Sequence, residues 1–214
     1  VCMFQKKILV WFRNDLRLHD NEVLVEAIHK ADQILPVYFF DPRQFTRTSF
    51  GTLKTGINRA NFLIESVKDL RNSFQQLGGN LLICFGEPEL LLPKLVQEYQ
   101  ISEVYHHREV AVEETYVSSL AEDALWKLQV NLKHFIGHTL YNKEDLPFPI
   151  KDIPDSFVKF KKKTEREATV KECFETPISA NFVEIPEPGE LPNLASLFED
   201  VLDVDAYPTN PFKG

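Results

Sequence analysis

The feature that most constrains the fold is the stretch of residues 7–21, KILVWFRNDLRLHDN. Its apolar run at residues 8–12 is β-branched and aromatic, without polar alternation, which predicts a strand buried on both faces. Polarity changes at Arg13, and Asp20 or Asn21 can cap a helix that follows. A buried strand, a polar loop and a capped helix form the first half of a β-α-β unit. In such a sheet the loop after the first strand faces the ligand crevice.

The same alternation continues along the chain. Further strands are expected at residues 33–40, 81–85, 102–106 and 130–136, and helices at residues 22–30, 57–77, 88–99 and 112–128. Five strands alternating with four helices predict an α/β fold, a Rossmann-like, five-stranded parallel sheet with helices on both faces. We expect the strand order 3-2-1-4-5, which places strands 1 and 4 side by side at the topological switch point.

Composition limits the class of protein. The chain has 214 residues, 43% of them hydrophobic, which supports one sizeable core. Its 3 Cys residues form no CxxC pair, so we expect neither a zinc ribbon nor a disulfide framework, and no metal site. A reducing, intracellular location follows, cytoplasmic in a bacterium and undetermined in a eukaryote. No apolar run is long enough to cross a membrane, so no membrane partner is expected.

Proline becomes frequent near residue 141. Residues 1–150 hold 6 of the 13 Pro residues and residues 151–214 hold 7. We therefore expect an α/β domain at residues 1–140 and an interdomain linker at residues 141–214, ending where a second domain begins. The linker should contain one helix at residues 155–168 and a short one around Leu194, Leu197, Phe198 and Leu202. We expect the segment after Thr176 to exchange its amide hydrogens quickly, and the linker to be anchored by Phe148, Phe157 and Phe160.

Several familiar motifs are absent. The sequence has no GxGxxG after the first strand, no GxxxxGK[ST] and no GxSxG. This argues against a simple dinucleotide dehydrogenase, a P-loop enzyme and an α/β-hydrolase.

Three short motifs each allow two interpretations. His106 and His107 suggest a metal site, but adjacent side chains at a strand end diverge, which favours a plain polar loop. A lysine run can bind DNA or be a solvated helix face, and the acidic residues that follow favour the latter; it consists of Lys159, Lys161, Lys162 and Lys163. The Lys-Thr-Gly sequence at residues 54–56 can hold an anion or simply begin a helix.

Glu109 belongs to the loop after the fourth strand, in the sequence HHREV. The predicted strand order brings this loop opposite Arg13, Asn14 and Asp15, with Asp41 on the rim of the same crevice. A carboxylate there can accept two parallel N–H bonds from an amino-pyrimidine edge such as that of a pterin. It can equally form a surface ion pair with Arg13 or Arg108, which contributes little. The residues alone leave both interpretations open.

Six segments together carry a resemblance to a known family. They are WFRNDLRLHDN, VYFFDPRQF, LKTGINRANFLIESVKDLR, GNLLICFGEPELLLPKL, YHHREVAVEE and GHTLYNKEDLPF, in this order. The chain resembles the amino-terminal domain of the photolyase/cryptochrome family, in particular its DASH branch. The later segments IPDSFVKFKKKTERE and CFETPISA resemble the linker of the same branch, so the resemblance covers nearly the whole chain.

The resemblance implies a flavoprotein of roughly twice this length, a deoxyribodipyrimidine photo-lyase. Its partner domain, absent here, would hold FAD, and blue light would drive the splitting of cyclobutane pyrimidine dimers, preferably in single-stranded DNA. The α/β domain would carry an antenna, usually methenyltetrahydrofolate. Carried over by motif, Glu109 would hold the pterin, and Arg13, Phe40 and Asp41 would line the pocket. No catalytic residue is expected in this chain, which alone should be inactive.

An alternative is a freestanding nucleotide-binding module of the electron-transfer-flavoprotein and stress-protein fold group. It shares the predicted sheet order, but the Pro-rich tail argues against it. A scaffold or signalling domain without a ligand is a third possibility.

Overall fold

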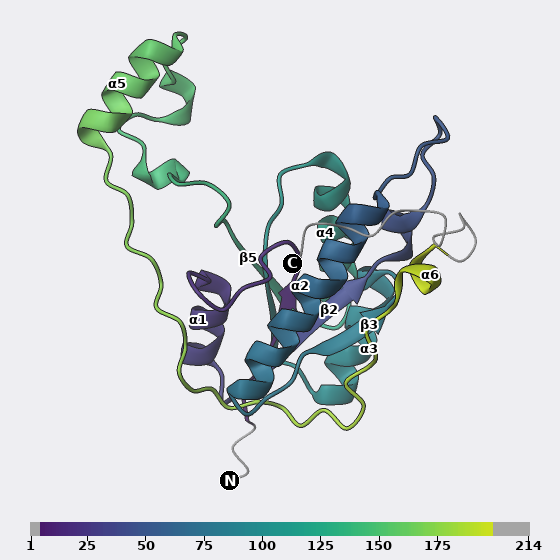
Figure 1. Ribbon diagram of the computed structural model, residues 1–214. Helices are drawn as coiled ribbons and strands as arrows, with labels where there is room; N and C mark the ends of the chain where they lie inside the picture. The colour runs from purple at the N-terminus through teal and green to yellow at the C-terminus, as the bar shows by residue number, and fades with distance from the viewer. Residues whose placement is uncertain (1–4, 199–214) are drawn as a thin grey trace.

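The computed structural model describes residues 5–198 of the chain. Its centre is one parallel sheet in the order β3-β2-β1-β4-β5 (Figure 1), as predicted. The strands are β1 (Lys7–Phe12), β2 (Gln33–Phe40), β3 (Leu82–Phe85), β4 (Glu103–His107) and β5 (Asn131–Phe135). The helices are α1 (Glu22–Lys30), α2 (Ile57–Gln76), α3 (Pro88–Tyr99), α4 (Val112–Trp126), α5 (Phe157–Glu167) and α6 (Leu194–Leu197). Short 3-10 turns are η1 (Pro42–Phe45), η2 (Lys143–Asp145) and η3 (Ile150–Asp152).

Helices cover both faces of the sheet, which confirms the predicted fold class. The helices α1 and α2 pack on one face, and α3 and α4 pack on the other. The change of face occurs at α3, which crosses from β3 at the sheet edge to β4 beside β1. Across the described residues, every helix is too short or too polar to cross a lipid bilayer.

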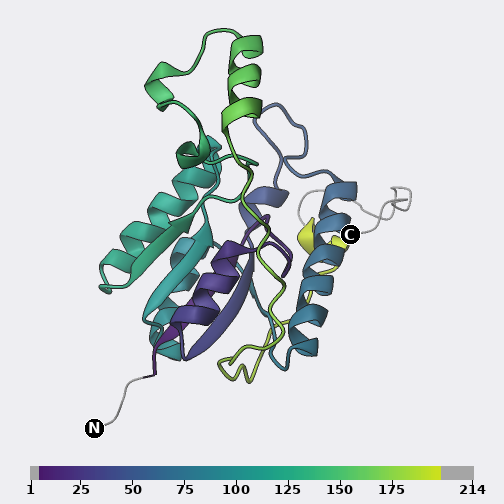
Figure 2. The same cartoon turned by 90° about the vertical axis from the view of Figure 1, so that its left-hand side faces the viewer.

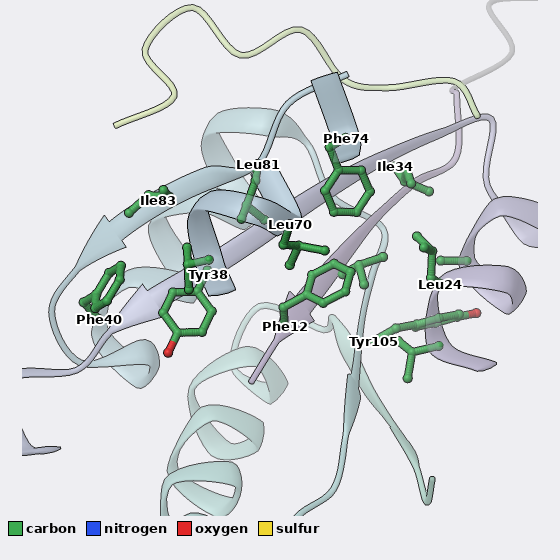
Figure 3. Packing of buried hydrophobic residues seen from close by; sticks show 14 of the residues in the cluster. Phe12, Leu24, Ile34, Tyr38, Phe40, Leu70, Phe74, Leu81, Ile83 and Tyr105 are labelled. Atoms are coloured by element: carbon green, nitrogen blue, oxygen red, sulfur yellow. The ribbon is translucent and has the colours of Figure 1, made fainter. Parts of the chain in front are cut away.

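Strand β1 supplies side chains to both layers of the core. Ile8, Val10 and Phe12 pack against α1 and α2, and Leu9 and Trp11 pack against α3 and α4. All five are at most 2% exposed, so the strand has no solvent face. This explains why its sequence lacks polar alternation. Figure 3 shows the first of these layers, with Phe12 beside Leu70 and Phe74 of α2.

Element ends follow local chain chemistry. Asn21 caps α1 by accepting a hydrogen bond from the Leu24 N–H at 3.1 Å, one of the two caps that the sequence allowed. Helix α4 ends at Trp126, two residues earlier than predicted. The turn after it places Gln129 at φ 57°, a left-handed conformation that a helix cannot continue through.

The segment after Thr176 lies along the sheet. Ile34 of β2 makes two backbone hydrogen bonds to this segment: its N–H donates to Asn181 O at 2.9 Å, and its carbonyl oxygen accepts from the Val183 N–H at 3.0 Å. Farther on, the Ile83 N–H donates to Pro188 O at 2.8 Å. The segment is therefore bound to the sheet by backbone hydrogen bonds between residues 181 and 188. Because the Val183 N–H is hydrogen-bonded to β2, its amide hydrogen should exchange slowly, unlike the fast exchange predicted for the whole segment.

The aromatic anchors of the tail differ in part from those predicted. Phe148 is buried and Phe160 packs on it, with ring centroids 5.6 Å apart. Phe157 is 75% exposed, so its prediction as an anchor is wrong: it is the first residue of α5, nearly one turn before Phe160, and solvent reaches most of its ring. Phe198 instead enters the main core, fully buried and edge-on to Phe45. Leu202, predicted for the short helix, lies outside the described residues.

We expect Phe198→Ala to lower the free energy of unfolding by about 3–4 kcal/mol, because it leaves a cavity under α6. Phe157→Ala, the matched control at an exposed ring, should change it by less than about 0.5 kcal/mol. Urea unfolding followed by circular dichroism measures both. Equal effects would mean that the tail is not anchored through Phe198.

Candidate functional site

The loops that follow β1 and β4 meet at the carboxyl edge of the sheet. The two strands are neighbours, with Trp11 opposite His106 in the register, so the residues after them face each other. This is the switch point predicted from the strand order, where open α/β sheets bind ligands. Five polar side chains gather there: Arg13, Asn14, Asp15, His107 and Glu109.

Asp15 and His107 join the two loops. Asp15 Oδ2 lies 2.5 Å from His107 Nδ1, and both side chains are 10% exposed. Asp15 Oδ1 also accepts the Arg13 N–H at 2.9 Å. Burial raises the pKa of Asp15, but the hydrogen bond and charge of His107 outweigh it, so that the pKa lies below its usual value. On its other side His107 touches Gly137, where a Cβ would lie 2.6 Å from Nε2.

Glu109 reaches across the same crevice. Its Oε1 accepts a hydrogen bond from Asn14 Nδ2 at 2.9 Å, and the contact is exposed to solvent. Within residues 5–198, its second oxygen, Oε2, accepts no hydrogen bond. Asn14 therefore fixes the orientation of the carboxylate and leaves one oxygen open to a ligand.

Arg13 turns away from the mouth of the crevice. Its Nη1 donates to Ser118 Oγ at 2.7 Å and its Nη2 to Glu114 O at 3.2 Å, both in α4. Its Cζ lies 4.9 Å from the ring centroid of Trp11. Burial lowers the pKa of Arg13, while Glu109 and Glu114 nearby act in the opposite direction. Arg13 thus supports the crevice from the α4 side, and the direct partner of Glu109 is Asn14.

The two adjacent histidines point to different partners. His106 stacks on Trp11, with centroids 4.9 Å apart and planes 8° from parallel, and its Nε2 lies 2.7 Å from His134 Nδ1. Burial lowers the pKa of His106 to about 2, so its ring is neutral. His107 turns to Asp15 instead. Across the described range no three His, Cys, Asp or Glu side chains gather as a metal centre.

Phe40 and Asp41 lie at the end of β2, on the other side of β1 from Glu109. Asp41 is 5% exposed and accepts three hydrogen bonds from the Arg43 guanidinium, which also binds Glu89. Phe40 is buried and stacks on Phe85, with centroids 5.7 Å apart. Both side chains are engaged with their own neighbours, and a role in lining the pocket remains a prediction.

Exposed apolar side chains border the crevice. Val110, directly after Glu109, is 76% exposed. On α4, Val112 is 86% exposed and Tyr116 is 62% exposed. Leu140, after β5, is 67% exposed. Open apolar surface of this kind beside a polar site is typical of a surface that a ligand or partner covers.

Sequence reasoning missed the pair of Asp15 and His107 and the contact of Arg13 with Ser118. The alternation of side chains along a strand could have predicted the contact of Arg13 with α4. Arg13 lies two residues beyond Trp11, so it continues on the face that α4 covers. The pair of Asp15 and His107 had a weaker signal, since each residue stands just beyond one of two neighbouring strands.

Comparisons with known proteins identify the family of the chain. A family model described as DNA photolyase matches residues 8–182. Cryptochrome DASH of Gloeobacter violaceus is 44% identical over 212 residues, which are 99% of this chain and 42% of that protein. Cryptochrome DASH of Xenopus laevis is 43% identical over 180 residues, 83% of this chain and 34% of that protein. In the solved structures, the cryptochrome of Synechocystis sp. PCC6803 matches with a TM-score of 0.79 at 41% identity, over 85% of this chain and 38% of that one.

These matches confirm the resemblance inferred from the six sequence segments. The chain spans about two fifths of the length of the relatives it matches.

We expect acid to weaken the fold through Asp15. A carboxyl group with a lowered pKa stabilises the fold above the pKa of an unfolded Asp, about 3.9, and this contribution is lost as the pH falls through the lower folded value. Asp15→Asn should lower the free energy of unfolding by about 2–4 kcal/mol at pH 6, because it leaves buried His107 without its anionic partner. The variant should then lose less further stability between pH 4 and pH 3 than the unmodified chain.

Urea unfolding from pH 6 to pH 3 measures both effects. Asp123→Asn, at an exposed position of α4, is the matched control and should follow the unmodified chain. Identical acid limbs in all three proteins would contradict the role given to Asp15.

Proposed function

This chain belongs to the DNA photolyase family, and from that premise we propose that it is the light-harvesting α/β domain of a DASH-type photolyase or cryptochrome. The observation that carries the proposal is the carboxylate of Glu109. It stands at the switch point, held by Asn14, with one oxygen open at a crevice with an apolar border.

The chemistry of this site fits the edge of a pterin. A pterin presents neighbouring N–H donors, and a carboxylate accepts two such bonds with charge assistance. Val110, Val112 and Tyr116 offer apolar surface to a flat ring or to the second wall of the site. The resemblance to the DASH branch implies a folate as the usual antenna of this domain. We therefore infer methenyltetrahydrofolate as the ligand, which when bound would supply absorption of near-ultraviolet and blue light.

The residues of this chain have positional roles. Glu109 would hold the pterin edge, and Asn14 would fix the rotamer of Glu109. The pair of Asp15 and His107 would keep the two crevice loops at a constant separation. Arg13 would stabilise the α4 side and keep a positive charge near Glu109. Phe40 and Asp41 are proposed for the more distant wall.

The activity of the whole protein is a further part of the proposal. Because the relatives are more than twice as long, we infer that a second domain of the same protein holds FAD, which when bound would supply the electron that splits a pyrimidine dimer. The substrate would be damaged DNA, preferably single-stranded, since a lesion there is easiest to flip out of the stack. The α/β domain would supply excitation energy and no catalytic residue.

We expect Glu109→Gln to weaken binding of methenyltetrahydrofolate to the full-length protein by about 30-fold. The amide keeps the shape of the side chain but replaces one acceptor with a donor, a loss of about 2 kcal/mol. Titration followed by the near-ultraviolet absorbance of the folate measures the affinity.

The matched control is Glu122→Gln, an equal change of charge on α4 beside His134 and away from the crevice. It should bind folate as the unmodified protein does. If Glu109→Gln also binds with unchanged affinity, Glu109 is only a surface acid and the antenna site lies elsewhere.

We expect residues 1–214 alone to purify without FAD and to show no light-dependent splitting of pyrimidine dimers, since the proposed flavin domain lies outside them. The visible spectrum and a dimer-repair assay check this, with the full-length protein as the positive control. Stoichiometric FAD in the shorter protein would disprove the division of roles between the two domains.

A further inference from the structure

Helix α4 carries large apolar side chains on the side that faces away from the sheet. Its inner side packs on the core through Ala121 and Leu125, which are fully buried. On its outer side Trp126 is 78% exposed, and Val112 and Tyr116 are similarly open. Figure 2 shows α4, drawn in teal, at the margin of the α/β body with the sheet on one side of it. The outer side of a surface helix is normally polar, so these apolar residues indicate that something covers this one.

The exposed residues of α4 form one straight line along the helix. They recur at alternating intervals of four and three residues, and we call them the outer seam: Val112, Tyr116, Ser119, Asp123 and Trp126. At about 100° per residue, all of them lie within about 40° of the direction of Val112. A mean interval of about 3.5 residues is the spacing at which two helices pack lengthwise against each other.

The outer seam is complementary to itself when a second α4 runs antiparallel to it. A two-fold axis at Ser119 places residues at equal distances before and after Ser119 opposite each other. Val112 and Trp126 each lie seven residues from Ser119, so the valine of one copy packs on the indole of the other. Tyr116 lies three residues before the axis and Asp123 four after it, so the phenol can donate to the carboxylate. The small Ser119 at the centre allows the two helices to approach closely.

Charges beside the outer seam also complement each other in this arrangement. Glu113 and Lys127 lie on one flank, six residues before and eight after the central serine. Equal flanks meet in an antiparallel pair, so Glu113 of one copy faces Lys127 of the other. Within residues 5–198, Lys127 has no acidic partner. Glu113 Oε2 contacts Lys54 Nζ at 2.5 Å, which leaves Oε1 for the second cation.

We propose that the outer seam of α4 is an interface with a second copy of this chain, in which the two helices pack antiparallel about Ser119. A parallel pair would instead place Asp123 against Asp123, which like charges disfavour. The interface goes beyond the proposed function. It also brings Trp126 of the second copy next to Val112, at the border of the crevice.

The length of α4 limits the strength of this contact. Its 15 residues span about 22 Å, so one helix pair buries less surface than a permanent dimer does. We therefore expect a dimer that forms in the micromolar range and dissociates on dilution. An anionic polymer or membrane fits the seam poorly, because Glu113, Glu122 and Asp123 lie on it or beside it.

The first test is sedimentation equilibrium of the 214-residue chain over about 5–500 µM, a range that brackets a micromolar dissociation constant. The mass should rise from monomer to dimer with concentration. Trp126→Ala should raise the dissociation constant about 10-fold or more, since a central aromatic ring is lost. Phe157→Ala removes an equally exposed ring from α5 and should leave the dissociation constant within about 2-fold. A monomer at every concentration would overturn the proposal.

The second test exchanges the charges across the interface. Glu113→Lys and Lys127→Glu should each weaken self-association about 10-fold or more, because each homodimer then has like charges facing each other at both ends. An equal mixture of the two variants should form a dimer about as tightly as the unmodified chain, since both contacts in the mixed pair are opposite in charge. A mixture as weak as its components would contradict the antiparallel pairing.

The matched control for the exchange is Asp69→Lys with Lys68→Glu, the same changes of charge at exposed positions of α2. These variants should dimerise as the unmodified chain does, alone and mixed. If they behave like the α4 variants, overall charge accounts for the effect and the interface is refuted. Circular dichroism checks that each variant is folded, and recovery in the mixture is itself evidence that both α4 variants are folded.

The third test determines the position of the two-fold axis. Ser119→Cys should form a disulfide between two copies on mild oxidation, because the axis brings these side chains together. Asp123→Cys, on the same seam, should not, since its two copies lie about 12 Å apart along the helices. The unmodified chain, in which Cys173 is exposed, gives the background. Equal cross-linking at the two positions would mean a different packing and would overturn the proposal.

The full-length protein separates this interface from the proposed function. It should dimerise with the same dependence on Trp126, whether or not it binds folate. If it stays monomeric while the 214-residue chain dimerises, the second domain covers the outer seam, and the interface with a second copy is refuted. The antenna role of Glu109 would not be affected by that result.

Discussion

Burial of β1 on both faces is the constraint on which the rest of the structure depends. Its five apolar side chains need a layer of helices on each side, so the chain must cross from one face to the other at α3. That crossing puts β4 beside β1 and opens the crevice between their carboxyl ends. The same strand that forms the centre of the core therefore also determines where a ligand can bind.

The crevice places ionisable groups next to a well-packed core, where a buried charge is costly. Asp15 and His106 respond to this cost in different ways. Asp15 keeps its charge because His107 and the Arg13 N–H stabilise it against the cost of burial. His106 gives up its charge, because its environment of Trp11 and buried strands disfavours the protonated ring. Neighbouring histidines thus differ in environment, one facing the core and one the polar loops. Only the latter lies where it can stabilise the site.

The parts of the fold that sequence could predict are those with local signals. Strand β2 and helices α1 and α3 lie at their expected bounds, because apolar runs, an Asn cap and a Pro at a helix start act within a few residues. The crevice was predictable because parallel strands share an edge. The partner of Glu109 was not, since the choice between Arg13 and Asn14 depends on the side of the strand to which each side chain turns.

The proline-rich tail shows what local signals leave out. Nothing periodic marks Phe182, yet it lies on Gly79, where any Cβ would overlap its ring. Helical spacing marks Phe198, but it does not predict that this ring enters the core beside Phe45. Such contacts join residues far apart in the sequence, so they follow only from the finished shape of the body.

The position of α5 depends on this docking of the tail. After α5, the Asp20 N–H donates to Phe174 O at 3.0 Å, and strands β2 and β3 then form backbone hydrogen bonds with residues 181–188. Before α5, the chain leaves β5 through the residues around Gly137, which lies against His107. The segments before and after α5 are therefore both attached to the crevice loops or to the sheet. Because these points are fixed by the core around β1, the burial of one strand also limits where α5 can lie.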